Sequence, residues 1–180
     1  MERRSFLRGT GAVVTGATTM LAGCTGDGGD GGGGGQSSPP ATESNTIQMV
    51  TEGGQYYFDP IGLAVEPGET VTWVIENGSH STTAYKEGNS VAKTTRIPDG
   101  STAWNSETLS ETGASFNHTF ETEGTYDYFC IPHKSLGMVG RIVVSAPGGP
   151  AEGSMPPDGA VPESGRITDE GAVAYDDFEG

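Results

Sequence analysis

Residues 124–144 read GTYDYFCIPHKSLGMVGRIVV, two β-forming stretches separated by a loop that carries an unusual set of side chains. Aromatic and β-branched residues are concentrated at both ends, as is typical of strands. The loop contains Cys130, His133 and Met138, although the 180-residue chain has only 2 Cys, 3 His and 5 Met. Thiolate, imidazole and thioether groups are soft or borderline ligands, so the loop indicates a metal site on a β-scaffold.

The residues before this stretch continue the β pattern and predict one all-β domain over residues 46–145. The alternating or β-branched segments are TIQMV, IGLAV, TVTWVIE and ASFNHTFE, and the turn sequences between strands are EPGE, ENGS, PDGS and ETGA. No segment keeps a helical period over several turns. Because half-buried strands must cover one face against a second sheet, we expect a two-sheet Greek-key β-sandwich with an excursion at its edge over residues 86–110.

The N-terminus has the features of an export signal over residues 1–23. Arg3 and Arg4 precede an uncharged stretch that is diluted with Gly and Thr and shorter than the roughly 20 apolar residues of a membrane-spanning helix. The paired arginines are typical of a twin-arginine signal. The sequence LAGC at residues 21–24 resembles a lipobox, so we predict that Cys24 is lipidated; the alternative is ordinary cleavage beside an incidental thiol.

The segments on either side of the predicted domain lack the apolar residues of a packed core. Residues 24–45 are rich in Gly, Ser and Pro and are predicted to form a flexible tether. Residues 146–180 are rich in Pro, Gly and acidic residues, and we expect a disordered tail. With lipid on Cys24, the tether would hold the domain at the outer face of the cell membrane.

The chain is strongly acidic, with a formal net charge of −15. Removal of residues 1–23 takes away three arginines and one glutamate, which leaves −17. Nucleic acid and anionic lipid are therefore poor electrostatic partners. This acidity with few lysines predicts a protein of a halophile, which must stay hydrated in brine; an ordinary acidic secreted protein is the alternative.

One more imidazole would complete a blue-copper ligand set, in which two imidazoles and a thiolate lie in a plane with a long axial Met. His80 follows the strand TVTWVIE, where a neighbouring strand can present it beside the loop. His118 alternates with Phe116 and Phe120 inside a strand, which is typical of a sheet residue that is partly packed or faces solvent. We therefore predict His80 as the ligand. Taken singly, Cys130 could be a buried thiol, Met138 a core methionine and His80 a turn residue, but together these residues indicate a metal site.

These motifs, GSHSTTAY at residues 78–85 and the stretch at residues 124–144, resemble the cupredoxin family of blue copper proteins. The likeness is to the plastocyanin, amicyanin and halocyanin group, and most of all to the halocyanins. It covers most of the domain and neither flank. The resemblance implies one copper ion held by four residues, which are His80, Cys130, His133 and Met138.

Two residues beside the ligands affect the site. Ser81 stands where many family members have Asn, and its shorter side chain is expected to make fewer ties between the ligand loops. Pro132 has no N–H to donate to the Cys130 sulfur. Fewer hydrogen bonds to the thiolate favour Cu(II) and lower the reduction potential.

The resulting hypothesis is a membrane-tethered, monomeric one-electron carrier that exchanges electrons with protein partners of a respiratory chain and is not an enzyme. The apolar surface around His133, which includes Leu136, is the expected electron exit, with the strand face at residues 126–128 as the alternative. Other functions left open are an accessory copper subunit of a larger oxidase or reductase and a copper storage or sensing module. A metal-free adhesion sandwich is a further alternative.

Overall fold

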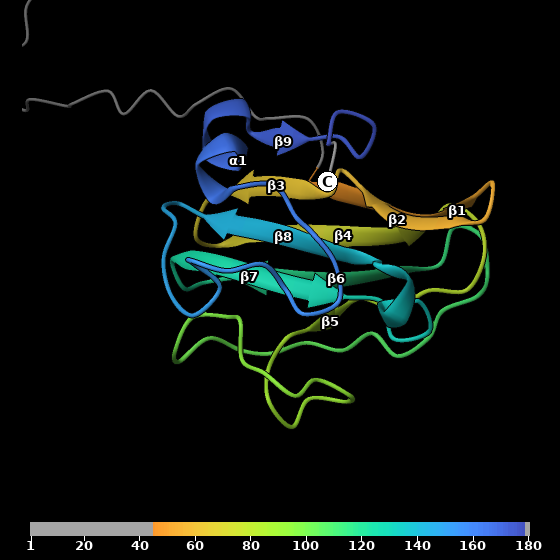
Figure 1. Ribbon diagram of the computed structural model, residues 1–180, viewed down its shortest axis with the longest axis horizontal. Helices are drawn as coiled ribbons and strands as arrows, with labels where there is room; N and C mark the ends of the chain where they lie inside the picture. The colour runs from red at the N-terminus through yellow and green to blue at the C-terminus, as the bar shows by residue number, and fades with distance from the viewer. Residues whose placement is uncertain (1–44, 179–180) are drawn as a thin grey trace, which may run out of the picture. The chain divides into compact units, whose positions relative to one another are not determined.

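The computed structural model describes residues 45–178, which form two β-sheets packed face to face (Figure 1). One sheet has the strand order β2-β1-β4-β6, with the bounds β1 Thr46–Glu52, β2 Gln55–Asp59, β4 Glu69–Ile75 and β6 Ser115–Phe120. The other has the order β5-β7-β8-β3-β9, with the bounds β3 Gly62–Val65, β5 Thr83–Ala84, β7 Gly124–Phe129, β8 Val139–Val144 and β9 Ala172–Val173. The predicted all-β sandwich is confirmed.

The chain crosses between the sheets several times. β1 and β4 are parallel neighbours in one sheet, and β3 and β8 are parallel neighbours in the other. Parallel neighbours cannot be joined by a tight hairpin, so each pair needs a connection through the opposite sheet. β7 and β8 are antiparallel, and the loop between them carries three of the four predicted metal ligands, Cys130, His133 and Met138.

The core between the sheets follows the two-residue alternation of the strands. On β4, Val71, Trp73 and Ile75 are buried, and the Trp73 ring meets the Tyr128 ring of the other sheet edge to face at 5.5 Å. The irregular excursion at residues 86–110 also supplies a core residue, because Trp104 is buried and its indole N–H donates to the hydroxyl of Thr82 at 2.9 Å.

The expectation of a disordered tail is wrong for residues 146–178, which we call the C-terminal segment. It contains helix α1 (Ser164–Glu170) and strand β9, which pairs antiparallel with β3 (Figure 1). Val161, Ile167 and Val173 are fully or almost fully buried. These few apolar residues pack against the domain although the average composition of the segment is that of a disordered chain.

The C-terminal segment covers the outer face of the five-stranded sheet. Every residue of β7 and β8 is buried, which requires cover on both faces of these strands. Gly62 of β3 allows α1 to approach closely, because a Cβ atom there would lie 2.7 Å from the side chain of Ile167.

A buried carboxylate, Asp127 on β7, connects this outer face to the C-terminal segment. Its two oxygens accept hydrogen bonds from Nε of Arg96 and Nε of Arg141, both at 2.8 Å. The two guanidinium groups also donate to the carbonyl oxygen of Ala151, at 2.8 and 3.2 Å. The segment is therefore hydrogen-bonded to charged groups that are themselves fixed by the sheet.

A second carboxylate, Glu152, balances the charge. Burial alone would raise the pKa of Glu152, but hydrogen bonds from Ser164 and Thr125, together with the two arginines, lower it. The carboxylate is ionised at neutral pH, so the C-terminal segment contributes a negative charge beside the two arginines.

Several predicted features lie outside the described residues. These are the signal at residues 1–23, the lipidation site Cys24 and the tether except for its last residue. Within residues 45–178, the helices are too short and too polar to cross a bilayer.

The packing of the C-terminal segment predicts a stability difference between two alanine variants of α1. Ile167→Ala should lower the free energy of unfolding by about 2–5 kcal/mol, because it leaves a cavity at a fully buried site. Asp169→Ala, on the exposed face of the same helix, should change it by at most about 0.5 kcal/mol. Denaturant titration measures both. Equal, negligible changes would mean that the segment does not pack on the domain.

Candidate metal centre

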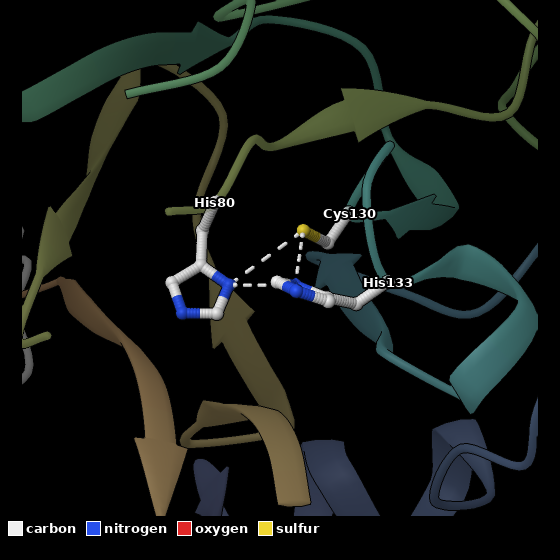
Figure 2. Close-up of side chains that lie close together, drawn as sticks. All are labelled: His80, Cys130 and His133. Carbon is white, nitrogen blue, oxygen red and sulfur yellow. Dashed lines mark hydrogen bonds between the residues drawn. The ribbon is translucent and has the colours of Figure 1, made fainter. Parts of the chain in front are cut away.

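His80, Cys130 and His133 converge at one end of the sandwich, with their ligand atoms pointing toward one another (Figure 2). His80 follows β4, Cys130 follows β7, and His133 lies just before the short 3-10 helix η1 (Lys134–Leu136). The Nδ1 atoms of the two histidines are 3.2 Å apart. The Cys130 sulfur lies 3.5 Å from Nδ1 of His133 and 3.7 Å from Nδ1 of His80.

These separations fit a single trigonal metal ion. Metal–nitrogen distances of about 2.0 Å and a metal–sulfur distance of about 2.3 Å place the nitrogens about 3.5 Å apart and each nitrogen about 3.7 Å from the sulfur. The observed triangle has nearly these dimensions, although its three corners come from segments up to 53 residues apart.

Met138 closes the ligand loop, which we define as residues 130–138. Its side chain is fully buried and belongs to the same apolar cluster as Cys130. Its carbonyl oxygen accepts a hydrogen bond from the Cys130 N–H at 3.0 Å, and its own N–H donates to the carbonyl of His133 at 3.3 Å. The backbone of Met138 is thus bound directly to the backbones of both other donors in the loop.

Hydrogen bonds orient the His80 ring toward the cluster. Its Nε2 lies 3.0 Å from the carbonyl oxygen of Asn77 and 3.0 Å from the hydroxyl of Thr51. A carbonyl oxygen only accepts, so Nε2 carries the hydrogen and the lone pair of Nδ1 faces the cluster. Thr51 and Asn77 are joined in turn, because the Thr51 N–H donates to Oδ1 of Asn77 at 2.6 Å.

The protonation states of the donors suit metal binding. Burial, with a smaller contribution from His133, lowers the pKa of His80 to about 4, and burial also lowers the pKa of His133. Both imidazoles are therefore neutral at neutral pH and can donate a lone pair. Burial raises the pKa of the Cys130 thiol, so metal binding must release a proton from this thiol.

Ser81 links the two ligand-bearing loops. Its backbone N–H lies 3.4 Å from the Cys130 sulfur, and its hydroxyl accepts a hydrogen bond from the Ile131 N–H at 2.7 Å. The shorter side chain therefore still bridges the loops. Pro132 is exposed in the turn before His133 and carries no N–H.

Tyr56 of β2 is a neighbour of the site that the sequence did not indicate. Its ring stacks on the His133 ring with the centroids 3.8 Å apart and the planes 14° apart. His133 itself is partly exposed, whereas His80, Cys130 and Met138 are fully buried. A single donor thus reaches the surface, and Tyr56 covers one face of its ring.

His118 lies on β6 and is not part of the cluster. Its ring stacks on Trp104 at 4.8 Å and meets Phe120 edge to face at 4.8 Å. This is the packing environment that the alternation with Phe116 and Phe120 predicted.

Comparison with known proteins agrees with this geometry. The family described as "Copper binding proteins, plastocyanin/azurin family" matches residues 45–145, more than half of the chain. Halocyanin of Natronomonas pharaonis is 34% identical over 173 residues, with 80% of this chain and 98% of the halocyanin covered. Plastocyanin of Scenedesmus fuscus is 33% identical over 102 residues, with 55% of this chain and 97% of the plastocyanin covered.

Among solved structures, pseudoazurin of Hyphomicrobium denitrificans superposes with a TM-score of 0.46 and 25% identity, covering 58% of this chain and 77% of the pseudoazurin. The family match, with the donor cluster, places the chain among the blue copper proteins. It belongs to the plastocyanin/azurin family of copper-binding proteins. It is an electron-transfer protein rather than an enzyme, and its donor set is consistent with one type 1 copper ion.

The geometry predicts opposite outcomes for two histidine variants. His80→Ala removes one corner of the donor triangle and should abolish the intense thiolate-to-copper absorption band of the oxidised protein. His118→Ala should keep the band, because this ring packs on Trp104 outside the cluster. Optical spectra at equal copper loading measure both. A bleached His118 variant beside a blue His80 variant would reverse the ligand assignment.

Proposed function

We propose that this protein is a mobile one-electron carrier whose type 1 copper ion is held by His80, Cys130, His133 and Met138. The observation that carries the proposal is the convergence of two imidazole nitrogens and one thiol within 3.7 Å of one another. When bound, copper supplies a centre that gains or loses one electron.

The surrounding residues favour rapid electron exchange because they keep the donors in place. Asn77 and Thr51 hold the His80 ring, and the backbone of Met138 binds those of Cys130 and His133. Donors fixed in this way rearrange little when the charge of the site changes. The site has no further room for a substrate to coordinate if Met138 supplies the fourth ligand, which favours electron transfer over catalysis.

The surface around His133 suits brief contact with a redox partner. His133 is the partly exposed donor, and Leu136 of the same loop exposes 61% of its surface. An apolar surface allows close approach without removing water from charged groups. The alternative exit at Tyr126, Asp127 and Tyr128 is not supported, because each of these residues is at most 1% exposed.

We further propose that the carrier works outside the cytoplasm, tethered to the membrane through a lipid on Cys24. The export signal, the lipobox and the Gly-rich tether support this location. The likeness to the halocyanin, which extends beyond residues 45–145, is compatible with it. Within the described residues, His80, Cys130 and His133 form a single group of metal donors, so an oxidase or reductase role would need a second subunit.

The exit surface predicts a kinetic effect of Leu136→Asp. Electron self-exchange between oxidised and reduced copies should slow by about tenfold or more, because a charge on the apolar contact costs on the order of 1.4 kcal/mol in the encounter. Met155→Asp adds the same charge at another exposed apolar residue and should have little effect. NMR line broadening in mixed samples at high salt measures the rates, and unchanged absorption spectra would show intact sites. Equal rates for both variants would place the exit elsewhere.

If a lipid on Cys24 anchors the protein, removing this cysteine should change where the protein is found without changing the copper site. Cys24→Ser should release a blue, folded protein into the medium, while the unchanged chain stays in the membrane fraction. Membrane retention of both forms, measured by fractionation and copper absorbance, would point to another anchor.

A further inference from the structure

The C-terminal segment touches the ligand loop at two adjacent residues, Asp158 and Gly159. The Asp158 carboxylate lies 3.3 Å from Nζ of Lys134, the residue after His133. A Cβ atom built on Gly159 would lie 2.9 Å from the carbonyl oxygen of Gly137 and 2.8 Å from the side chain of Val139. Gly137 and Val139 are the residues on either side of Met138.

We infer that the C-terminal segment positions the ligands of the metal centre, with Gly159 fixing the backbone around Met138 and Asp158 fixing the loop beside His133. This inference rests on the proposed ligand set. Asp158 and Gly159 touch no donor atom and act as positioning residues.

Gly159 contacts the loop at a point where its backbone is constrained. Gly137 ends η1 in the left-handed conformation, with φ of 89°, and Val139 begins β8. Between them, Met138 is hydrogen-bonded through its backbone to both Cys130 and His133. A displacement at this point is therefore passed on to all three loop ligands.

Asp158 fixes the neighbour of His133 through a partly buried ion pair. The Lys134 and Asp158 side chains are only 19% and 22% exposed. The same carboxylate accepts a hydrogen bond from the hydroxyl of the fully buried Tyr85 at 2.6 Å. The Lys134 ammonium group also lies 4.9 Å from the centre of the Phe129 ring, and Phe129 directly precedes Cys130.

The C-terminal segment can position the ligand loop because hydrogen bonds also hold the segment to the five-stranded sheet. Arg96 and Arg141, which share Asp127, both donate to the carbonyl of Ala151. Asp158 and Gly159 thus lie between this anchor and helix α1, whose Ile167 is fully buried, and the loop packs against a fixed chain.

Gly159→Ala tests the contact with Met138, and Gly165→Ala is the matched control. The added methyl group at residue 159 must push Gly137 or Val139, whereas at residue 165 in α1 it meets no atom within 4 Å. We expect Gly159→Ala to shift the thiolate-to-copper bands and the reduction potential and to speed copper loss to a chelator by about tenfold. Gly165→Ala should match the unchanged protein in all three measurements.

A measurement on the metal-free protein keeps the inference separate from the proposed function. Amide exchange of Cys130 and Met138, whose N–H groups close the loop, should be faster in Gly159→Ala than in Gly165→Ala. An unchanged protein that binds copper without an intense band would overturn the proposed function. The positioning role would be overturned if the two variants had the same absorption bands, the same reduction potential and the same amide exchange rates.

Charge variants test Asp158 and remain informative if Gly159→Ala does not fold. Asp158→Asn leaves the charge of Lys134 uncompensated beside the site and should raise the reduction potential, because positive charge favours the reduced state. Lys134→Gln should lower it, and the double variant should return it toward the starting value. No shift in either single variant would exclude the proposed role of Asp158.

Discussion

The spacing of three donor atoms, no more than 3.7 Å apart, is the constraint on which the rest of this structure depends. Two neutral imidazoles and a thiol have little attraction for one another without a metal ion, so the surrounding chain must hold them together. Different parts of the chain hold the different donors in place. Asn77 and Thr51 hold His80 from the end of one sheet, while strand pairing between β7 and β8 holds the loop of Cys130 in the other.

Sequence patterns predicted the sandwich and the site because both depend on short-range regularities. The alternation of β4 and β6 distinguished a strand-end histidine, His80, from a packing histidine, His118. The spacing of the ligand loop lies within a single hairpin. The stacking of Tyr56 on His133 was not predictable, because it depends on how β2 lies across the sandwich, and no local pattern encodes that placement.

The fold of the C-terminal segment was missed for a different reason. Its composition is that of a disordered chain, yet a few well-placed apolar residues are buried, among them Val161, Ile167 and Val173. The segment also uses charges that composition counts as solvating. Asp127 is buried between two buried arginines, and removing one partner of such a buried ion pair costs about 3–5 kcal/mol. An average over the segment cannot reveal pairing between specific residues.

Strand β9 also changes the edge of the five-stranded sheet. Without it, β3 would present a row of free backbone N–H and C=O groups, a surface on which another chain can add a strand and begin aggregation. β9 pairs with Gly62 and Leu63 and is itself only two residues long, ending beside the irregular backbone that follows Val173. The new edge offers too little backbone for a second copy to extend the sheet. The short strand thus acts as a terminator of β-sheet growth.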